Sequence, residues 1–139
     1  MTANLSLKMT STRPYLLRAI YEWLIDNQLT PYILVDAGMP NVKVPEQFVE
    51  DGKIILNIEP QAVGRLRIGN DAVEFDARFS GIGYHLFIPM LAIKAIYAFE
   101  NGRGMVFNEE EDSGDKNPPP PSNQTALLKR GRPNLKIVK

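Results

Sequence analysis

RPYLLRAIYEWLIDNQLTPYILVD, residues 13–36, decides the fold of this chain, because its hydrophobic period changes part-way along. In the first part, polar side chains recur at Arg18, Glu22 and Asp26, the spacing of one face of a helix. This spacing also brings Arg18 and Glu22 within reach of an ion pair. The last part, residues 32–36, is a short run rich in β-branched and aromatic residues. The stretch therefore predicts a helix that leads into a strand.

The predicted helix, residues 15–27, is apolar around most of its circumference. Pro14 fits its first turn, where a missing N–H costs no hydrogen bond. A surface helix normally has one apolar face, so this helix must bury a second side. It either lies centrally in its own core or contacts another subunit, and a domain of about 100 residues leaves little room for the first arrangement. We therefore expect a homodimer, with the contact formed by Tyr15, Leu16, Ala19, Ile20 and Trp23.

Several short strands with turn signals between them are predicted after the helix. Val73, Phe75, Ala77 and Phe79 alternate with charged residues, which is typical of a sheet with one buried and one wet face. Strands are also predicted over 53–58, 65–68 and 84–89, a short helix over 90–100, and residues 105–107 close the domain. The predicted class is α+β, with one long helix followed by several short, mostly antiparallel strands.

Most catalytic and metal chemistry has no candidate residues in this sequence. The chain has no cysteine, and its single histidine, His85, has no partner for a metal site. His85 is predicted to be a strand residue that faces solvent or a neighbour. Gly81 and Gly83 lack the third glycine and the helix that a phosphate-binding loop needs. We expect a binding protein without cofactor or metal, and not an enzyme.

The beginning of the chain has no apolar segment of the kind found in signal peptides, and its apolar runs are too short to cross a bilayer. The expectation is a soluble protein of the cytoplasm without a membrane partner.

Charge is distributed unevenly along the chain, although the formal net charge is zero. Residues 1–107 carry 10 Lys and Arg against 11 Asp and Glu, residues 108–128 carry 1 against 5, and residues 129–139 carry 5 against 0. Four consecutive prolines lie in the acidic segment. The pattern predicts a folded domain (1–107), a flexible acidic, proline-rich linker (108–128) and a disordered basic tail (129–139).

The basic tail has three interpretations. Two give it a binding function, and the third gives it none. Arg130 and Arg132 lie in an Arg-Gly-Arg-Pro core that is close to an AT hook, which binds the minor groove of A·T-rich DNA. Leu135, Ile137 and Val138 instead favour docking to a protein, since they can fill apolar pockets or add a strand to a partner. A solvated tail without a partner is the third interpretation. The neutral charge of the domain and the acidic linker disfavour nucleic acid, including an RNA-binding surface on the domain.

Six segments of the chain are similar to those of a known family. They are RPYLLRAIYEWLIDNQLTPYILVD (13–36), DGKIILNI (51–58), VGRLRIGND (63–71), FDARFSGI (75–82), AIYAFENGRGMVF (95–107) and RGRPNLKIVK (130–139). Together they closely resemble the stringent starvation protein B family, adaptors that deliver ssrA-tagged polypeptides from stalled translation to the ClpXP protease. The resemblance covers the predicted domain and the tail and skips only the variable linker.

The resemblance implies a small two-sheet, Sm-like domain that dimerises through its N-terminal helix and holds the tag peptide in a groove. The resemblance also implies the ribosome as a further partner. The groove residues carried over by motif are Phe48, Phe75, Asp76, Ala77, Arg78 and Phe79. The tail residues expected to dock on the zinc-binding N-terminal domain of ClpX are Arg130, Arg132, Pro133, Leu135, Ile137, Val138 and Lys139.

The chain departs from the family pattern at Asp76, where the family often has Asn. Because the ssrA tag is itself acidic, this carboxylate is expected to weaken tag binding or to change the preferred tag. Arg78 is expected to meet a tag carboxylate or main-chain carbonyls, against the alternative of a solvated strand charge.

Overall fold

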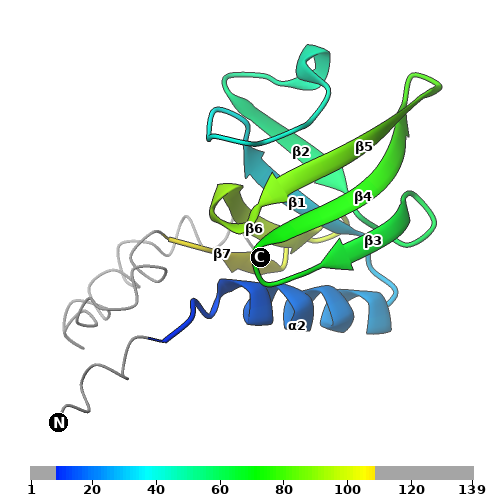
Figure 1. Cartoon of the computed structure of the whole chain (residues 1–139). Helices are drawn as coiled ribbons and strands as arrows, with labels where there is room; N and C mark the ends of the chain where they lie inside the picture. Colours follow the sequence, from blue (N-terminus) through cyan, green and yellow to red (C-terminus); the bar gives the residue numbers. More distant parts are fainter. Residues whose placement is uncertain (1–8, 109–139) are drawn as a thin grey trace, which may run out of the picture.

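The computed structural model of the chain describes residues 9–108 (Figure 1). Within them one α-helix is followed by seven strands and two short 3-10 helices. In chain order these are α2 (Arg13–Asp26), β1 (Pro31–Asp36), η1 (Glu46–Phe48), β2 (Lys53–Asn57), β3 (Gly64–Ile68), β4 (Ala72–Phe79), β5 (Ile82–Pro89), η2 (Met90–Ala92), β6 (Ile93–Ala98) and β7 (Gly104–Val106). The predicted order of one helix followed by antiparallel strands is confirmed. The predicted tail and all but the first residue of the predicted linker lie outside the described residues.

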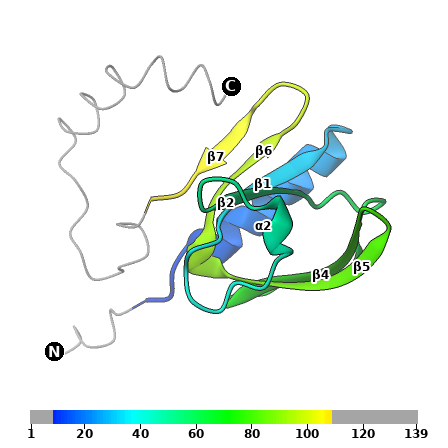
Figure 2. The same cartoon turned by 90° about the horizontal axis from the view of Figure 1, so that it is seen from above.

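The strands form two antiparallel sheets, as the family resemblance implied. The four-stranded sheet has the order β2-β1-β6-β7 and the three-stranded sheet the order β3-β4-β5. Figure 2 shows the β4–β5 pair as a curved ribbon that lies to one side of β1 and β2. Side chains from the inner faces of both sheets, among them Ile33, Leu56, Phe75 and Ile96, form one core and are 0–1% exposed. The similarity to Sm-type folds stays a prediction.

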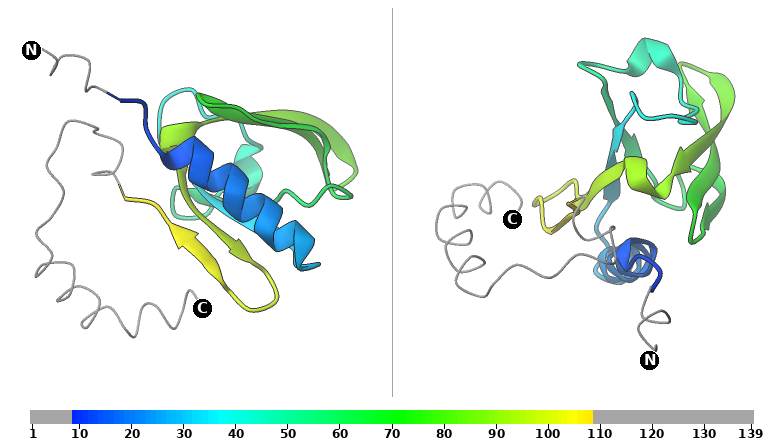
Figure 3. Two further views of the ribbon diagram at one scale, coloured as in Figure 1. Left: turned by 90° about the horizontal axis from the view of Figure 1, so that it is seen from below. Right: turned by 60° about the vertical axis from the view of Figure 1, so that its left-hand side comes forward.

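Helix α2 runs along one end of the two sheets (Figure 3). It contacts β1 and β6 of one sheet and β3 of the other, and it buries Leu17 and Leu24 completely. Arg18 and Glu22 have the spacing of an ion pair but do not form one in the part of the chain that the structure describes. Arg18 instead donates to the main-chain oxygen of Ile68 at 3.0 Å, which ties the helix to the end of β3.

The first turn of α2 carries a buried charge that the sequence did not indicate. Arg13 is 1% exposed, and its guanidinium donates to the main-chain oxygens of Ile93 (2.8 Å) and Asn108 (3.0 Å). It also lies 5.3 Å from the centre of the Phe107 ring. Carbonyl oxygens offset the cost of removing this charge from water. Arg13 therefore fastens the start of the helix to the last residues of the domain.

The predicted short helix over residues 90–100 is wrong, because only residues 90–92 are helical and β6 follows. The burial pattern of β6 explains the error. Ile93, Ala95, Ile96 and Ala98 are buried, so apolar residues are spaced by two, one and two positions instead of strictly alternating. A shift of register against β1 causes this irregularity. Such spacing resembles one face of a helix. Pairing with a strand on each side nevertheless makes these residues a strand.

Candidate functional site

The second half of β4 has one unpaired edge. β5 pairs with all of β4, but pairing with β3 ends at Asp76, so among residues 9–108 no strand lies beside Ala77–Phe79 on that side. The two-residue turn Ser80–Gly81 makes Phe79 and Ile82 a hydrogen-bonded pair, and such pairs alternate along the hairpin. The main-chain N–H and C=O of Arg78 therefore point away from β5, toward the unpaired edge.

Within the described part of the chain a second unpaired edge belongs to β2, the outermost strand of the other sheet. Ile58 donates to Pro31 and Ala37 donates to Gly52, and this register makes every second residue of β2 bond to β1. The main-chain groups of the residues in between, Ile55 and Asn57, consequently point away from β1.

Two adjoining hollows lie along these edges. One has a volume of about 600 Å³ and lies between the segment 61–64 and the unpaired edge of β4. The other, about 330 Å³, lies between β2 and β4. Both are lined by Ala62, Ala77 and Arg78. We call this continuous feature the edge groove. Two small alanine side chains leave the space for a further chain beside β4.

Aromatic side chains stand at the end of β4 beside the groove. The ring centres of Phe48 and Phe79 are 5.2 Å apart, and those of Phe79 and Tyr84 are 5.6 Å apart. Gln47, beside Phe48 in η1, donates to the Tyr84 hydroxyl at 2.9 Å. This polar link and the ring contacts hold η1 against the β4–β5 hairpin.

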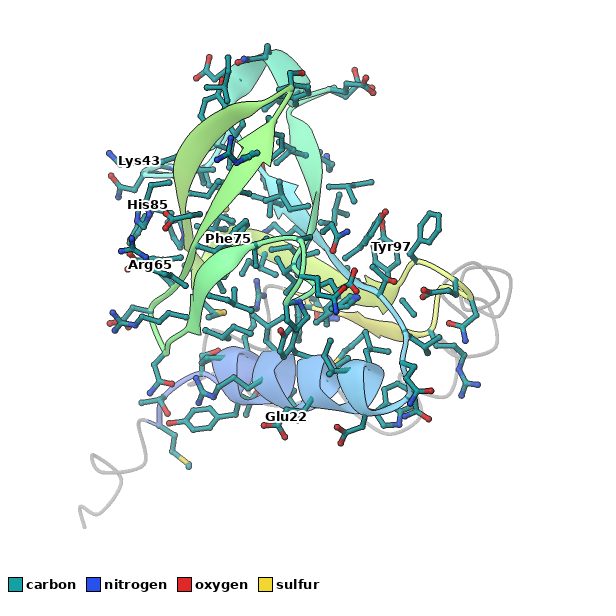
Figure 4. The ribbon with its side chains drawn as sticks, turned by 90° about the vertical axis from the view of Figure 1, so that its right-hand side faces the viewer. Glu22, Lys43, Arg65, Phe75, His85 and Tyr97 are labelled. Carbon is teal, nitrogen blue, oxygen red and sulfur yellow. The ribbon has the colours of Figure 1, made fainter. Side chains whose placement is uncertain are left out.

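Charged side chains of β3, β4 and β5 gather on the outer face of the three-stranded sheet, where Figure 4 shows His85 close to Arg65. His85 Nδ1 lies 2.7 Å from Asp76 Oδ1, and His85 Nε2 lies 3.3 Å from Glu74 Oε1. Arg65 Nε lies 3.5 Å from Asp76 Oδ2. Hydrogen bonds to Asp76 and then to Glu74 raise the pKa of His85 above its usual value. Carboxylate oxygens only accept hydrogen bonds, so the protonated imidazolium satisfies both contacts.

Comparison with known proteins identifies the family of this chain. A family model described as "Stringent starvation protein B" matches residues 11–139. The chain belongs to the stringent starvation protein B family. A curated relative from Haemophilus influenzae (strain ATCC 51907 / DSM 11121 / KW20 / Rd), named "Stringent starvation protein B homolog", is 49% identical over 117 residues. The match covers 84% of this chain and 78% of the relative. The resemblance recognised in the sequence motifs is confirmed.

The groove residues carried over from the stringent starvation protein B family lie in three different settings. Ala77, Arg78 and Phe79 line the edge groove. Phe75 is 1% exposed and reaches the groove only as part of its floor, so it supports β4 and offers little contact area. Phe48 contacts the groove through Phe79.

Asp76, expected from the resemblance to depart from the family pattern, also lines the larger hollow. Its carboxylate is already paired with Arg65 and His85, which offsets the negative charge it presents to a ligand. The prediction for His85 is confirmed, since it is an exposed strand residue in contact with its neighbours.

Several groove residues were missed by the sequence reasoning. Ala62, Tyr84, Tyr32 and Ile55 line the two hollows. Tyr84 could have been found, because a two-residue turn at Ser80–Gly81 fixes Ala77 opposite Tyr84. Tyr32 and Ile55 come from the other sheet, and nothing in the local pattern shows which sheet edges lie together.

Three of the five predicted dimer residues lie on the side of α2 that faces away from the core. Tyr15 and Trp23 are 48% and 45% exposed, and Ala19 is also exposed. Leu16 and Ile20 are half-buried at the border of the core. One chain thus leaves an apolar stripe open along its helix, and the homodimer stays a prediction.

Within residues 9–108 no three His, Cys, Asp or Glu side chains are grouped so that they could hold a metal ion. In the same range no helix has the length and apolar character needed to cross a membrane. The unpaired strand edges of the edge groove suit an extended polypeptide.

Proposed function

We propose that this chain is a non-enzymatic adaptor that binds ssrA-tagged polypeptides in the edge groove and delivers them to the ClpX unfoldase of the ClpXP protease. The observation that carries the proposal is the unpaired edge of β4 at Arg78, beside a hollow of about 600 Å³, in a member of the stringent starvation protein B family.

The groove favours an extended peptide through its main chain. A peptide beside β4 gains hydrogen bonds to the N–H and C=O of Arg78, and alternate side chains then face Ala77 or solvent. The exposed Arg78 guanidinium makes only a long contact, 3.4 Å, to the oxygen of Gly81. It can therefore turn to a carboxylate of an acidic tag at little cost.

The C-terminal segment supplies the second contact of the proposed mechanism. Leu135, Ile137 and Val138 offer apolar side chains to the zinc-binding N-terminal domain of ClpX, while the basic residues around them increase the rate of encounter. A linker of 21 residues spans about 25 Å if it behaves as a flexible chain. Joining two weak contacts in this way raises effective concentration and can tighten the whole assembly by about 10² to 10⁴.

A homodimer through the exposed stripe of α2 completes the proposal. Burial of Tyr15, Ala19 and Trp23 against a second copy removes apolar surface from water, and each dimer then carries two tails. Delivery of stalled-translation products places the protein in the cytoplasm, with the ribosome as a further partner.

Deletion of residues 129–139 separates the two contacts of the adaptor. In a degradation assay with ClpXP and an ssrA-tagged reporter at low concentration, the full chain should accelerate degradation and the shortened chain should not. Tag-peptide binding, measured by fluorescence anisotropy, should be equal for both. If the shortened chain accelerates degradation normally, or if it loses peptide binding, the proposed roles of tail and groove are wrong.

A further inference from the structure

The outer face of the four-stranded sheet carries an apolar surface next to the edge groove. Tyr32 on β1 lies opposite Tyr97 on β6, with ring centres 6.0 Å apart, and its ring lies 5.1 Å from that of Phe99. Ile55 on β2 belongs to the same face and is 52% exposed. We call Tyr32, Ile55, Tyr97 and Phe99 the aromatic shelf. Figure 4 shows Tyr97 on the side of the molecule opposite His85.

Phe99 is held in its exposed position by a specific set of hydrogen bonds. Its main-chain N–H donates to the oxygen of Thr30 at 2.8 Å. The next residue, Glu100, accepts from the Thr30 N–H (2.8 Å) and from the Thr30 hydroxyl (2.6 Å). These bonds lower the pKa of Glu100, so its carboxylate is charged and the link is intact at neutral pH. Phe99 is 61% exposed on this anchored turn.

The shelf adds little to the core of the single chain. The inner face of the sheet already buries Ile33, Leu56 and Ile96 almost completely. Among residues 9–108 no element packs over Phe99 or Ile55, which keep more than half of their surface exposed. An aromatic side chain has 150–250 Å² to bury, so an apolar partner would gain from this surface.

The shelf is continuous with the edge groove. Tyr32 and Ile55 line the smaller hollow together with Ala77 and Arg78. The main-chain groups of Ile55 also point to the unpaired edge of β2. A chain that lies beside β4 and continues past β2 therefore meets Tyr32 first and Phe99 beyond it.

We propose that the aromatic shelf binds the residues that flank the tag in the delivered polypeptide and that it prefers apolar and aromatic side chains there. The inference rests on the proposed function, because the occupant is the same chain that fills the groove. Continuity with the groove favours this occupant over a second copy of the protein, for which α2 already offers a separate exposed stripe. The shelf makes the adaptor selective for tagged chains whose flanking segment is unfolded and apolar.

Fluorescence anisotropy with labelled peptides tests this inference. The probes are the ssrA tag alone and the tag with a six-residue extension at either end, made of Gly and Ser only or with two of these replaced by Phe. With the unaltered protein, the Phe-containing extension at one of the two ends should bind about 5-fold tighter than the Gly/Ser extension. Phe99→Ser should remove this gain and leave the affinity for the tag alone unchanged.

Leu91→Ser is the matched control, since Leu91 is 49% exposed on η2 and lies in neither groove nor shelf; it should keep the gain. Equal affinities for the two extensions, or a gain that survives Phe99→Ser, would overturn the shelf while the groove stands. Failure of the tag alone to bind would overturn the proposed function itself. A change of oligomeric state in Phe99→Ser, measured by sedimentation, would overturn the inference in favour of a subunit contact.

Discussion

Arg78 contributes to the edge groove twice, through main-chain groups on the unpaired edge of β4 and through an exposed guanidinium. Arg78→Gln keeps the first contribution and removes the charge, so ssrA-peptide affinity should fall by about 3- to 10-fold. Anisotropy titration measures the affinity, and thermal unfolding should be unchanged because the side chain is exposed and makes only the long contact to Gly81. Arg67→Gln, an exposed change on neighbouring β3, is the control and should bind normally. Equal affinity of the Arg78→Gln protein would remove this charge from the site.

His85 should titrate above its ordinary pKa of 6.5, because Asp76 and Glu74 stabilise the imidazolium. A folded-state pKa above the unfolded one stabilises the protein below the unfolded pKa, and this contribution is lost as pH rises through the folded pKa. An NMR titration of the imidazole protons measures the pKa directly.

Asp76→Asn should lower that pKa more than Glu74→Gln does, since the hydrogen bond to Asp76 is the larger cause of the shift. A pKa at or below 6.5 in the unaltered protein would mean that these contacts do not persist in solution.

At the residue scale, the sequence predicted which strand residues share a face. Ala77 and Arg78 belong to a strand with a regular period of two, and the family resemblance named both as groove residues. Arg13 could not be predicted, because its carbonyl partners Ile93 and Asn108 lie about 80 and 95 positions away in the chain. A charged residue at a helix start is read as solvated unless the tertiary structure is known.

The exposed stripe of α2 gives a prediction at the scale of elements. Ala19→Glu places a charge between Tyr15 and Trp23, so it should weaken dimerisation by at least about 10-fold, or ~1.4 kcal/mol. Glutamate is a good helix former, so circular dichroism should be unchanged. Sedimentation equilibrium measures the association.

Lys53→Glu, an exposed charge reversal on β2 away from α2, is the control and should leave association intact. A monomeric unaltered protein, or an Ala19→Glu protein that associates normally, would contradict the assignment of this stripe.

At the scale of elements, regular patterns were predictable and irregular ones were not. The alternation of residues 73–79 predicted β4, and β5 was predicted from residue 84, two residues after its start at Ile82. β6 was misread as helical, because a register shift breaks its alternation and only the flanking strands β1 and β7 reveal its state.

At the scale of the whole molecule, the sequence predicted the class but not the edge groove. Helix followed by antiparallel strands can be read from local periods. The groove exists because β3 stops pairing at Asp76 and because β2 of the other sheet lies nearby. Both facts depend on how two sheets meet, which is set by packing of the core and not by any one segment.

The central claim is that a tag peptide lies in the edge groove. Amide NMR titration of the protein with unlabelled ssrA peptide tests it most directly. The account predicts saturable shifts at Ile55, Asn57, Ala77 and Arg78, with little change at Arg65 on the outer face. No saturable shift, or shifts confined to the outer face around Arg65 and His85, would contradict it.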